Sequence, residues 1–310
     1  MARLREVATE EELVALRGKM SAHLPLSVGV HGFLDVILKC QVLPFGDSRV
    51  YAPAGKEAPT LAVVAPSCSQ RYIQSMTIFW DADKEDDGEV VRLLKTLPGW
   101  DWSAPAYYRV TPLPVFTKLQ AFFKNGRLGN GEMWCHVMLE GPLFTIEDSD
   151  IQQPTIPEGF VLDSLRADDV SAVLSPWHYR WTESQGGLEY LLAKLPSVAI
   201  RRRQAQEPKA EAPTLGHIVS WCFLHNLCFL ANTFTIPEHR RQGFGTAVAL
   251  AMAQKLRQKD IPVRSVVERS NAASIRYHEN LGFRRQCDMV LFIMLPLEKT
   301  LEDFISKESD

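Results

Sequence analysis

Long apolar runs, a large net charge and regular metal-ligand spacings are all missing from this sequence. No stretch of its 310 residues approaches the roughly 20 consecutive apolar residues that a membrane-spanning helix needs. The formal net charge of −3 argues against a nucleic acid or an anionic membrane as a partner, because both attract strongly basic surfaces. Residues 1–13 lack the apolar core of a secretory signal, and their acidic residues are uncommon in transit peptides. We therefore expect a cytoplasmic protein, with a mitochondrial location left open.

The cysteines and histidines show no pattern that would bind a metal or form a disulfide framework. The six cysteines are scattered, mostly among apolar residues, and none forms a C-x-x-C pair. They are Cys40, Cys68, Cys135, Cys222, Cys228 and Cys287. The eight histidines have no ligand spacing either. The pattern favours reduced, buried thiols and predicts that the protein binds no metal.

One stretch of the C-terminal half combines a strand, a basic glycine-containing turn and a helix. Residues 228–236 are apolar or β-branched without charge, which predicts a strand covered on both faces. Pro237 ends this strand. Apolar residues then recur every fourth position from Phe244 to Leu256, which predicts a helix with one buried stripe. The turn between the two elements reads R-R-Q-G-F-G over residues 240–245.

This turn has the chemistry of a phosphate-binding site. The start of a helix leaves about four backbone N–H groups unpaired and carries roughly half a positive charge. Gly243 and Gly245 have no Cβ, so a bulky anion can approach these N–H groups closely. Arg240 and Arg241 add positive charge at the rim. The turn therefore predicts a cradle for a phosphate group.

Two other interpretations of the turn remain open on the residues alone. The dinucleotide fingerprint G-x-G-x-x-G fits poorly, because Val248 occupies the third glycine position, although Glu268 could act as its ribose-binding acid. A basic helix cap on an ordinary α/β turn is the second alternative.

Two motifs in order resemble those of the GNAT superfamily of N-acyltransferases. The R-x-x-G-x-G spacing after I-P-E resembles the coenzyme A pyrophosphate loop of that superfamily. The pattern N-x-x-S-I followed by L-G-F over residues 271–283 resembles its second motif, a helix that flanks the pantetheine arm. Within the superfamily, residues 177–187, 220–224 and 235–243 are most similar to the glycine N-acyltransferase group. Residues 23–32 are faintly similar to the N-terminal half of the same group.

The resemblance implies a fold and a division of the chain. We expect an α/β (α+β) protein with a GNAT fold, whose mixed central sheet is splayed between its fourth and fifth strands. The expected parts are an N-terminal α/β domain at 1–148, a linker at 149–158, the acyltransferase domain at 159–300 and a tail at 301–310. The N-terminal domain is expected to be a degenerate GNAT-like unit. Its residues 61–65 and 75–80 predict strands, and its glycine-rich residues 124–131 predict a helix stop and turn.

The resemblance also implies a cosubstrate and the residues that bind it. Acyl-CoA, such as acetyl-CoA, would supply the acyl group, and its pantetheine arm would pair with the edge of the fourth strand. The residues implied for coenzyme A binding are Phe234, Thr235, Ile236, Arg240, Arg241, Gln242, Gly243, Phe244, Gly245, Thr246, Asn271 and Ser274.

The catalytic positions depart from the pattern of the group. Members place a glutamate on the fourth strand, but Phe229 occupies that position here. Glu268, His225 or a water held by Asn232 are the substitute bases that the sequence offers. The usual acid of the second motif is a tyrosine, and His278 stands there with Tyr277 beside it. Either could protonate a leaving thiolate.

The function expected from these observations is transfer of an acyl group from coenzyme A to the amine of a small molecule. Glycine or another amino acid is the first candidate acceptor. The missing glutamate favours an alternative in which the protein binds coenzyme A as a regulator without turnover. A further alternative is acylation of a protein N-terminus or lysine.

Overall fold

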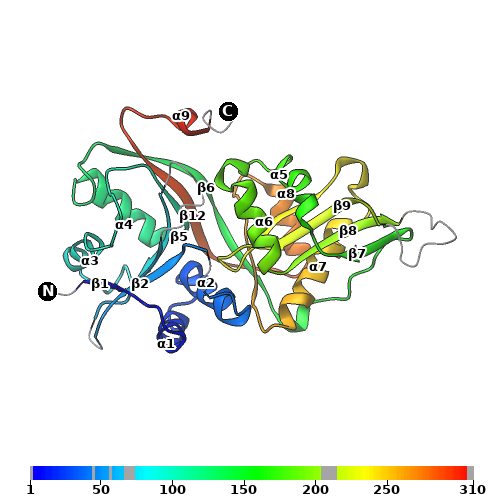
Figure 1. Ribbon diagram of the computed structural model, residues 1–310, viewed down its shortest axis with the longest axis horizontal. Coiled ribbons are helices and arrows are strands. Elements are labelled where there is room, and N and C mark those ends of the chain that lie inside the picture. Colours follow the sequence, from blue (N-terminus) through cyan, green and yellow to red (C-terminus); the bar gives the residue numbers. More distant parts are fainter. Residues whose placement is uncertain (1–2, 44–45, 56–57, 66–73, 204–214, 306–310) are drawn as a thin grey trace. The chain divides into compact units, whose positions relative to one another are not determined.

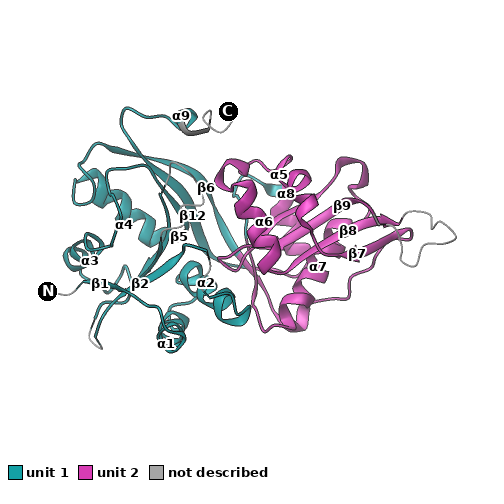
Figure 2. Ribbon diagram, viewed as in Figure 1, with its two compact units in different colours: residues 1–143, 266–272, 285–310 teal, residues 144–265, 273–284 magenta. Residues whose placement is uncertain are grey.

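The chain forms two compact units that are not continuous in sequence. The computed structural model describes residues 3–43, 46–55, 58–65, 74–203 and 215–305, so Cys68 and residues 306–310 of the expected tail lie outside the described residues. Unit 1 comprises residues 1–143, 266–272 and 285–310, and unit 2 comprises residues 144–265 and 273–284 (Figure 2). The domain boundaries that the sequence suggests remain predictions. The last strand, expected within the domain at 159–300, groups with unit 1. No helix among the described residues is long and apolar enough to span a bilayer.

Unit 1 is built on a sheet whose strands are interleaved with helices (Figure 1). Its elements, in chain order, are β1 (Leu4–Glu6), α1 (Glu10–Ser21), α2 (Val28–Lys39), β2 (Arg49–Pro53), β3 (Leu61–Ala65), β4 (Gln74–Trp80), α3 (Asp87–Leu94), β5 (Ala106–Pro112), α4 (Leu113–Lys124) and β6 (Met133–Ile146). Strands β1 to β4 are antiparallel neighbours in sequence order, and β4 is parallel to β5. The predicted strands at 61–65 and 75–80 are confirmed, as is the turn after α4, where Gly126, Gly129 and Gly131 have positive φ.

Unit 2 repeats the same succession of elements. They are β7 (Phe160–Asp163), α5 (Val170–Leu174), α6 (Gln185–Lys194), β8 (Ser197–Arg203), β9 (Leu215–Leu224), β10 (Leu230–Thr235), α7 (Phe244–Arg257), β11 (Val263–Val266) and α8 (Ala272–Asn280). Strands β7 to β10 form an antiparallel four-stranded sheet in sequence order, as β1 to β4 do. Among the described residues β10 is an edge strand and β11 belongs to the other sheet. The fourth and fifth strands of this unit are therefore splayed, as expected.

The last strand of the chain completes the sheet of unit 1. Strand β12 (Arg284–Pro296) lies between β5 and β6 in the strand order, and the short helix α9 (Glu302–Ile305) follows it. The Phe292 ring of β12 stacks on Tyr108 of β5 at a centroid distance of 4.5 Å, and both side chains are fully buried. Phe292 also meets the edge of Phe116 in α4 at 4.8 Å. Stacked and edge-on aromatic pairs of this kind stabilise a core beyond their buried area.

A buried carboxylate joins α1 to α2 within unit 1. The side chain of Asp35 is 0% exposed, and its Oδ1 accepts a hydrogen bond from Arg17 Nε at 2.6 Å. His31 Nδ1 lies 3.2 Å from its other oxygen, and Lys39 Nζ lies 3.6 Å from Oδ1. Burial raises the pKa of Asp35, but the imidazole of His31 and the charges of Arg17 and Lys39 outweigh it and lower the pKa to about 2. The carboxylate is therefore ionised and paired at neutral pH.

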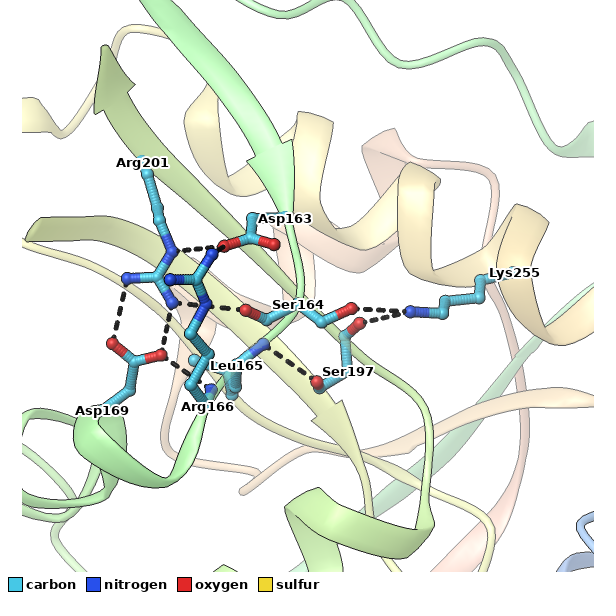
Figure 3. A network of polar contacts seen from close by, with 8 residues as sticks. All are labelled: Asp163, Ser164, Leu165, Arg166, Asp169, Ser197, Arg201 and Lys255. Atoms are coloured by element: carbon cyan, nitrogen blue, oxygen red, sulfur yellow. Dashed lines mark hydrogen bonds and ion pairs between the residues drawn. The ribbon is translucent and has the colours of Figure 1, made fainter. Parts of the chain in front are cut away.

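A second buried ion-pair network, in unit 2, fixes the first strand to the second and holds helix α7 (Figure 3). Arg201 of β8 donates to Asp163 of β7 at 2.6 Å and makes a two-pronged contact with Asp169, whose Nη1–Oδ1 distance is 3.0 Å. The Arg201 side chain is 6% exposed. Lys255 of α7 donates to Ser197 O at 2.9 Å and to Ser164 Oγ at 3.0 Å. The last turn of α7 is thereby tied to the ends of β7 and β8.

The Asp35 cluster predicts a specific dependence of stability on pH. Because the folded-state pKa of Asp35 lies below its ordinary value of 3.8, its contribution is complete above that value and disappears as pH falls through about 2. The loss amounts to about 2 kcal/mol of unfolding free energy. Asp35→Asn should cost about 3 kcal/mol at pH 7, because Arg17 and Lys39 lose their carboxylate partner, and this difference should shrink as pH falls from 4 to 2. Urea titrations across pH measure it, with exposed Glu10→Gln as a control that should show no such change.

The network of unit 2 predicts that two arginines bonded to the same aspartate differ in their effect on stability. Arg201→Met leaves Asp169 and Asp163 without a buried partner and should lower the unfolding free energy by about 3 kcal/mol. Arg166 also contacts Asp163, at 2.7 Å, but its side chain is 53% exposed, so Arg166→Met should have little effect. Chemical denaturation of both variants compares them directly. Equal effects would mean that the buried pair contributes no more than an exposed one.

Candidate functional site

The turn between β10 and α7 has a backbone that only certain residues adopt readily. A single 3₁₀ turn, Pro237–His239, follows β10, and α7 begins at Phe244. Arg241 has φ of 60° and Gly243 has φ of 85°, in the left-handed region that favours glycine. A Cβ built on Gly243 would meet no atom within 4 Å, so the glycine is required by its backbone conformation and faces open space. The predicted buried stripe of α7 is confirmed at Phe244, Val248, Met252 and Leu256.

The start of α7 presents unpaired amides beside two cations. Among the described residues, no side chain caps this helix. Within the described residues, Ala247 is the first residue of α7 whose amide makes an intrahelical hydrogen bond, to Gly243 O at 2.9 Å. Arg240 is held in place by a 3.0 Å bond from its Nε to Thr235 O, and its guanidinium lies 5.3 Å from the centre of the Phe234 ring. Amides, dipole and arginines together favour an anion at this position.

A groove of about 470 Å³ runs from this turn to α8, entirely within unit 2. Its lining consists of Thr233, Phe234, Thr235, His239, Arg240, Arg241, Gly243, Phe244, Gly245, Thr246, Ala273, Ser274, Tyr277 and His278. In the described part of the chain, neither Asp nor Glu lines the groove. Its size is within the range of ligand sites, and its charge suits an anionic ligand.

Strand β10 borders the groove with an irregular, partly unpaired edge. Its register against β9 shifts between Ala231 and Phe234, and Asn232 within this bulge has φ of 47°. The side-chain amide of Asn232 donates to Val173 O at 3.0 Å, which fixes the bulge to α5. After the bulge, Ser220 Oγ bonds Phe234 O and Thr235 Oγ1, both at 2.9 Å. An edge strand of this kind can accept hydrogen bonds from an extended ligand.

Tyr277 keeps its proton and points toward the helix start. Its hydroxyl donates to Gly245 O at 2.7 Å, and burial raises its pKa above the ordinary value. A Cβ on Gly245 would come within 3.8 Å of this hydroxyl and 3.5 Å of Thr235 Oγ1. These are ordinary van der Waals distances, so Tyr277 packs closely against Gly245 beside the first turn of α7.

His278 is neutral, and its tautomer is defined by its neighbours. Its Nδ1 lies 2.8 Å from Ser274 O, and since a carbonyl only accepts, Nδ1 carries the proton and Nε2 carries the lone pair. The residue is 6% exposed and stacks on Phe144 at 5.4 Å. Burial lowers its pKa, which keeps the imidazole uncharged at neutral pH. In this state Nε2 can take up a proton but cannot donate one.

The structure brings most of the predicted site residues together. The predicted residues that line the groove are Phe234, Thr235, Arg240, Arg241, Gly243, Phe244, Gly245, Thr246, Ser274, Tyr277 and His278. Ile236 and Gln242 do not line it: the Ile236 amide donates to Val219 O, and Gln242 Nε2 donates to Glu238 O.

The other predicted residues lie in different surroundings. Glu268 and Asn271 belong to the segment grouped with unit 1, where Ser270 Oγ donates to Glu268 at 2.7 Å. His225 contacts the buried Glu183 at 3.3 Å and accepts from the Leu227 amide. Phe229, which stands where members of the group place a glutamate, is buried. The role of Glu268 as a base therefore stays a prediction.

Sequence reasoning missed Thr233, His239 and Ala273, which also line the groove. Thr233 alternates with Thr235 along β10, so the period of the strand was a signal for it. His239 sits on the 3₁₀ turn and meets the ring edges of Phe160 and Phe244, both at 5.4 Å. No local sequence signal predicts this turn.

Comparison with known proteins identifies the same region. The FR47-like protein family matches residues 211–291. Human glycine N-acyltransferase-like protein 2 is 33% identical over 69 residues, which is 22% of this chain. The matched segment spans only 24% of the length of that relative.

Several solved structures share the fold of this chain. A Drosophila protein aligns with a TM-score of 0.75 at 16% identity, over 96% of this chain and 100% of its own. A tandem GNAT protein from the clavulanic acid biosynthesis pathway aligns with a TM-score of 0.54 at 13% identity, over 97% of this chain and 100% of its own. A GCN5-related N-acetyltransferase from Kribbella flavida aligns at 0.52 and 16% identity, over 79% and 90% respectively. At these identities the likeness shows the fold. The chain therefore has a GNAT fold, and its C-terminal region is similar to the FR47-like protein family over residues 211–291 and to a glycine N-acyltransferase-like protein over 69 residues.

Proposed function

We propose that this protein transfers an acyl group from acyl-CoA to the primary amine of a small molecule, with glycine or another amino acid as the first candidate acceptor. The observation that carries the proposal is the start of α7, where unpaired amides and two arginines face a groove without carboxylates. The residues fit coenzyme A, because Gly243 leaves open space at the helix start and β10 offers an edge to the pantetheine arm.

Each part of the groove has a distinct task in this proposal. The amides of residues 243–246, with Arg240 and Arg241, bind the diphosphate, and the edge of β10 at Phe234–Thr235 aligns the arm. When bound, acyl-CoA supplies the reactive thioester. The chain contributes mainly by holding this thioester and the amine at a productive distance, which accounts for a large share of the acceleration in such reactions.

Proton transfer is assigned to two neighbouring side chains. Tyr277 is protonated at neutral pH, and unlike a ring N–H its hydroxyl can rotate away from Gly245 O, so it is the donor that we assign to the leaving thiolate. His278 is neutral with its lone pair on Nε2, so we assign it to take the proton of the attacking amine. This reverses the acid role that the sequence motif suggests for His278, because its Nδ1 proton is committed to Ser274 O.

A regulator that binds coenzyme A without turnover is the alternative that one observation favours. Within the described residues no carboxylate lines the groove, and Phe229 replaces the expected strand glutamate. Acylation of a protein amine instead of a small molecule is a further alternative. The two experiments below separate binding from turnover.

Gly243→Asp should abolish most coenzyme A binding while the protein stays folded, at a cost of about 1 kcal/mol for a side chain at this positive φ. The substitution places a negative charge at the helix start, where the diphosphate would sit, and its Cβ meets no neighbour within 4 Å. We expect the dissociation constant, measured by calorimetry with coenzyme A, to rise about tenfold or more. Gly99→Asp is the matched control, since Gly99 also has positive φ, 69°, and equally open surroundings. Equal affinities for the two variants would place the diphosphate elsewhere.

Tyr277→Phe should slow the chemical step without weakening cofactor binding. Release of free thiol from acetyl-CoA, followed across a panel of amino acids and other primary amines, identifies the acceptor. With that acceptor, loss of the proton donor should lower kcat about 100-fold. The dissociation constant for coenzyme A should stay within about twofold, and Tyr190→Phe serves as a control on α6. Binding of coenzyme A with no thiol release for any amine would favour the regulator.

A further inference from the structure

A hydroxyl, an imidazole and a carboxylate are linked by short distances in unit 1, outside the groove of unit 2. Ser21 is the last residue of α1, and its Oγ lies 3.0 Å from Nε2 of His31 in α2. The other ring nitrogen, His31 Nδ1, lies 3.2 Å from Oδ2 of Asp35, one turn further along α2. This order of groups, in which a base contacts a hydroxyl and is itself oriented by an acid, activates serine nucleophiles in proteins.

The carboxylate determines which nitrogen of the neutral imidazole carries the proton. Asp35 is ionised at neutral pH, because its partners lower its pKa to about 2, and an ionised carboxylate only accepts hydrogen bonds. In neutral His31 the proton therefore lies on Nδ1, beside Asp35, and the lone pair of Nε2 is directed to the Ser21 hydroxyl. Nε2 is thus placed to take the hydroxyl proton when Ser21 attacks an electrophile.

The exposure of the three residues suits these roles. The side chains of His31 and Asp35 are 3% and 0% exposed, and exclusion of water strengthens the interaction between them. Ser21 is exposed, so a reagent in solution can reach it. Gly18 lies one turn earlier on the same face of α1, and a Cβ built there would meet no atom within 4 Å. The helix face beside the hydroxyl is therefore open.

The Ser21 hydroxyl has a second acceptor within reach. Its Oγ also lies 3.0 Å from Arg17 O, a local bond that serines in helices often make. A hydroxyl carries one proton and rotates, so it can donate either to this carbonyl or to His31 Nε2. The bond to Arg17 O alone would give an ordinary serine, whereas donation to His31 gives a nucleophile. The two arrangements therefore differ in the reactivity of Ser21.

The guanidinium of Arg17 adds positive charge beside the hydroxyl. Arg17 is four residues before Ser21, which places both side chains on one face of α1. Its Nε donates to Asp35 Oδ1 at 2.6 Å, and its side chain is 32% exposed. Among the described residues this bond uses Nε, so the two Nη groups remain to interact with an anion. Positive charge at this position would stabilise the oxyanion that forms when a serine attacks a carbonyl.

We propose that Ser21, His31 and Asp35 form a nucleophilic centre that hydrolyses small activated esters. Ser21 Oγ attacks the ester carbonyl carbon while His31 Nε2 takes its proton, and the bond to the leaving alcohol breaks as His31 returns that proton to it. A water molecule, deprotonated by His31, then releases the acyl group from Ser21 as a carboxylic acid and restores the hydroxyl. Asp35 acts through His31 and is a positioning residue. The centre lies within unit 1 and does not depend on the proposed acyl-CoA transfer.

Diisopropyl fluorophosphate tests the nucleophile directly on the full-length chain. The reagent phosphorylates activated serines with loss of fluoride, and mass spectrometry of peptides locates the adduct. We expect Ser21 to be labelled about tenfold faster or more than Ser171, an exposed serine of α5 that serves as an internal control. Equal labelling rates at the two serines would show that Ser21 is not activated, which overturns the proposal.

Variants separate the nucleophile, the base and the positioning residue. Ser21→Ala should remove most hydrolysis of p-nitrophenyl acetate, whereas Ser171→Ala should not. His31→Gln should slow labelling of Ser21 about 100-fold. Asp35→Asn should lower kcat for the ester about tenfold with KM unchanged, while Lys39→Met, which removes another partner of Asp35 at 3.6 Å, should leave kcat within about twofold.

The Ser21 results decide the proposal without the buried variants, because an exposed serine is replaced without loss of the fold. Unchanged ester hydrolysis in Ser21→Ala would refute the centre. Coenzyme A takes no part in either assay, so both outcomes are independent of whether the protein transfers acyl groups.

Discussion

The backbone amides at the start of α7 need a hydrogen-bond acceptor from outside the helix, and several residues of unit 2 keep this position open for one. A helix start without a side-chain cap is costly unless water or a ligand meets its N–H groups, and here the neighbouring residues keep the position open. Gly243 turns the chain with a positive φ, the Gly245 carbonyl accepts from the Tyr277 hydroxyl, and Arg240 is fixed to β10. At its other end, Lys255 ties the same helix to the sheet. The proposed anion binding thus depends on how this helix is held in place.

The duplicated arrangement shows how one backbone can carry opposite electrostatics. Both units place a helix after their fourth strand, yet one helix start faces arginines and the other is capped by its own aspartate. The helix dipole has the same direction in both helices, with its positive end at the helix start. The side chains of the short loop before each helix therefore decide which charge is favoured there.

The sequence predicted the parts of the fold and site that local chemistry determines. The buried stripe of α7 and the strands predicted at 61–65 and 75–80 follow from the periodicity of their apolar residues. Strand β12 was not predicted, because its partners β5 and β6 are far away in sequence. The proton on His278 Nδ1 depends on a carbonyl one turn earlier, and the division into units depends on packing. Neither leaves a motif in the sequence.

The position of β12 has a consequence for biosynthesis. Unit 1 begins at the N-terminus, but its sheet lacks a central strand until residues 284–296 have left the ribosome. Until then β5 and β6 have no β12 between them, and Tyr108 lacks the ring on which it stacks. Unit 2 is synthesised in the interval and can assemble its four-stranded sheet first. Until β12 is made, the edges of β5 and β6 are open, and unpaired strand edges of this kind promote aggregation of a nascent chain.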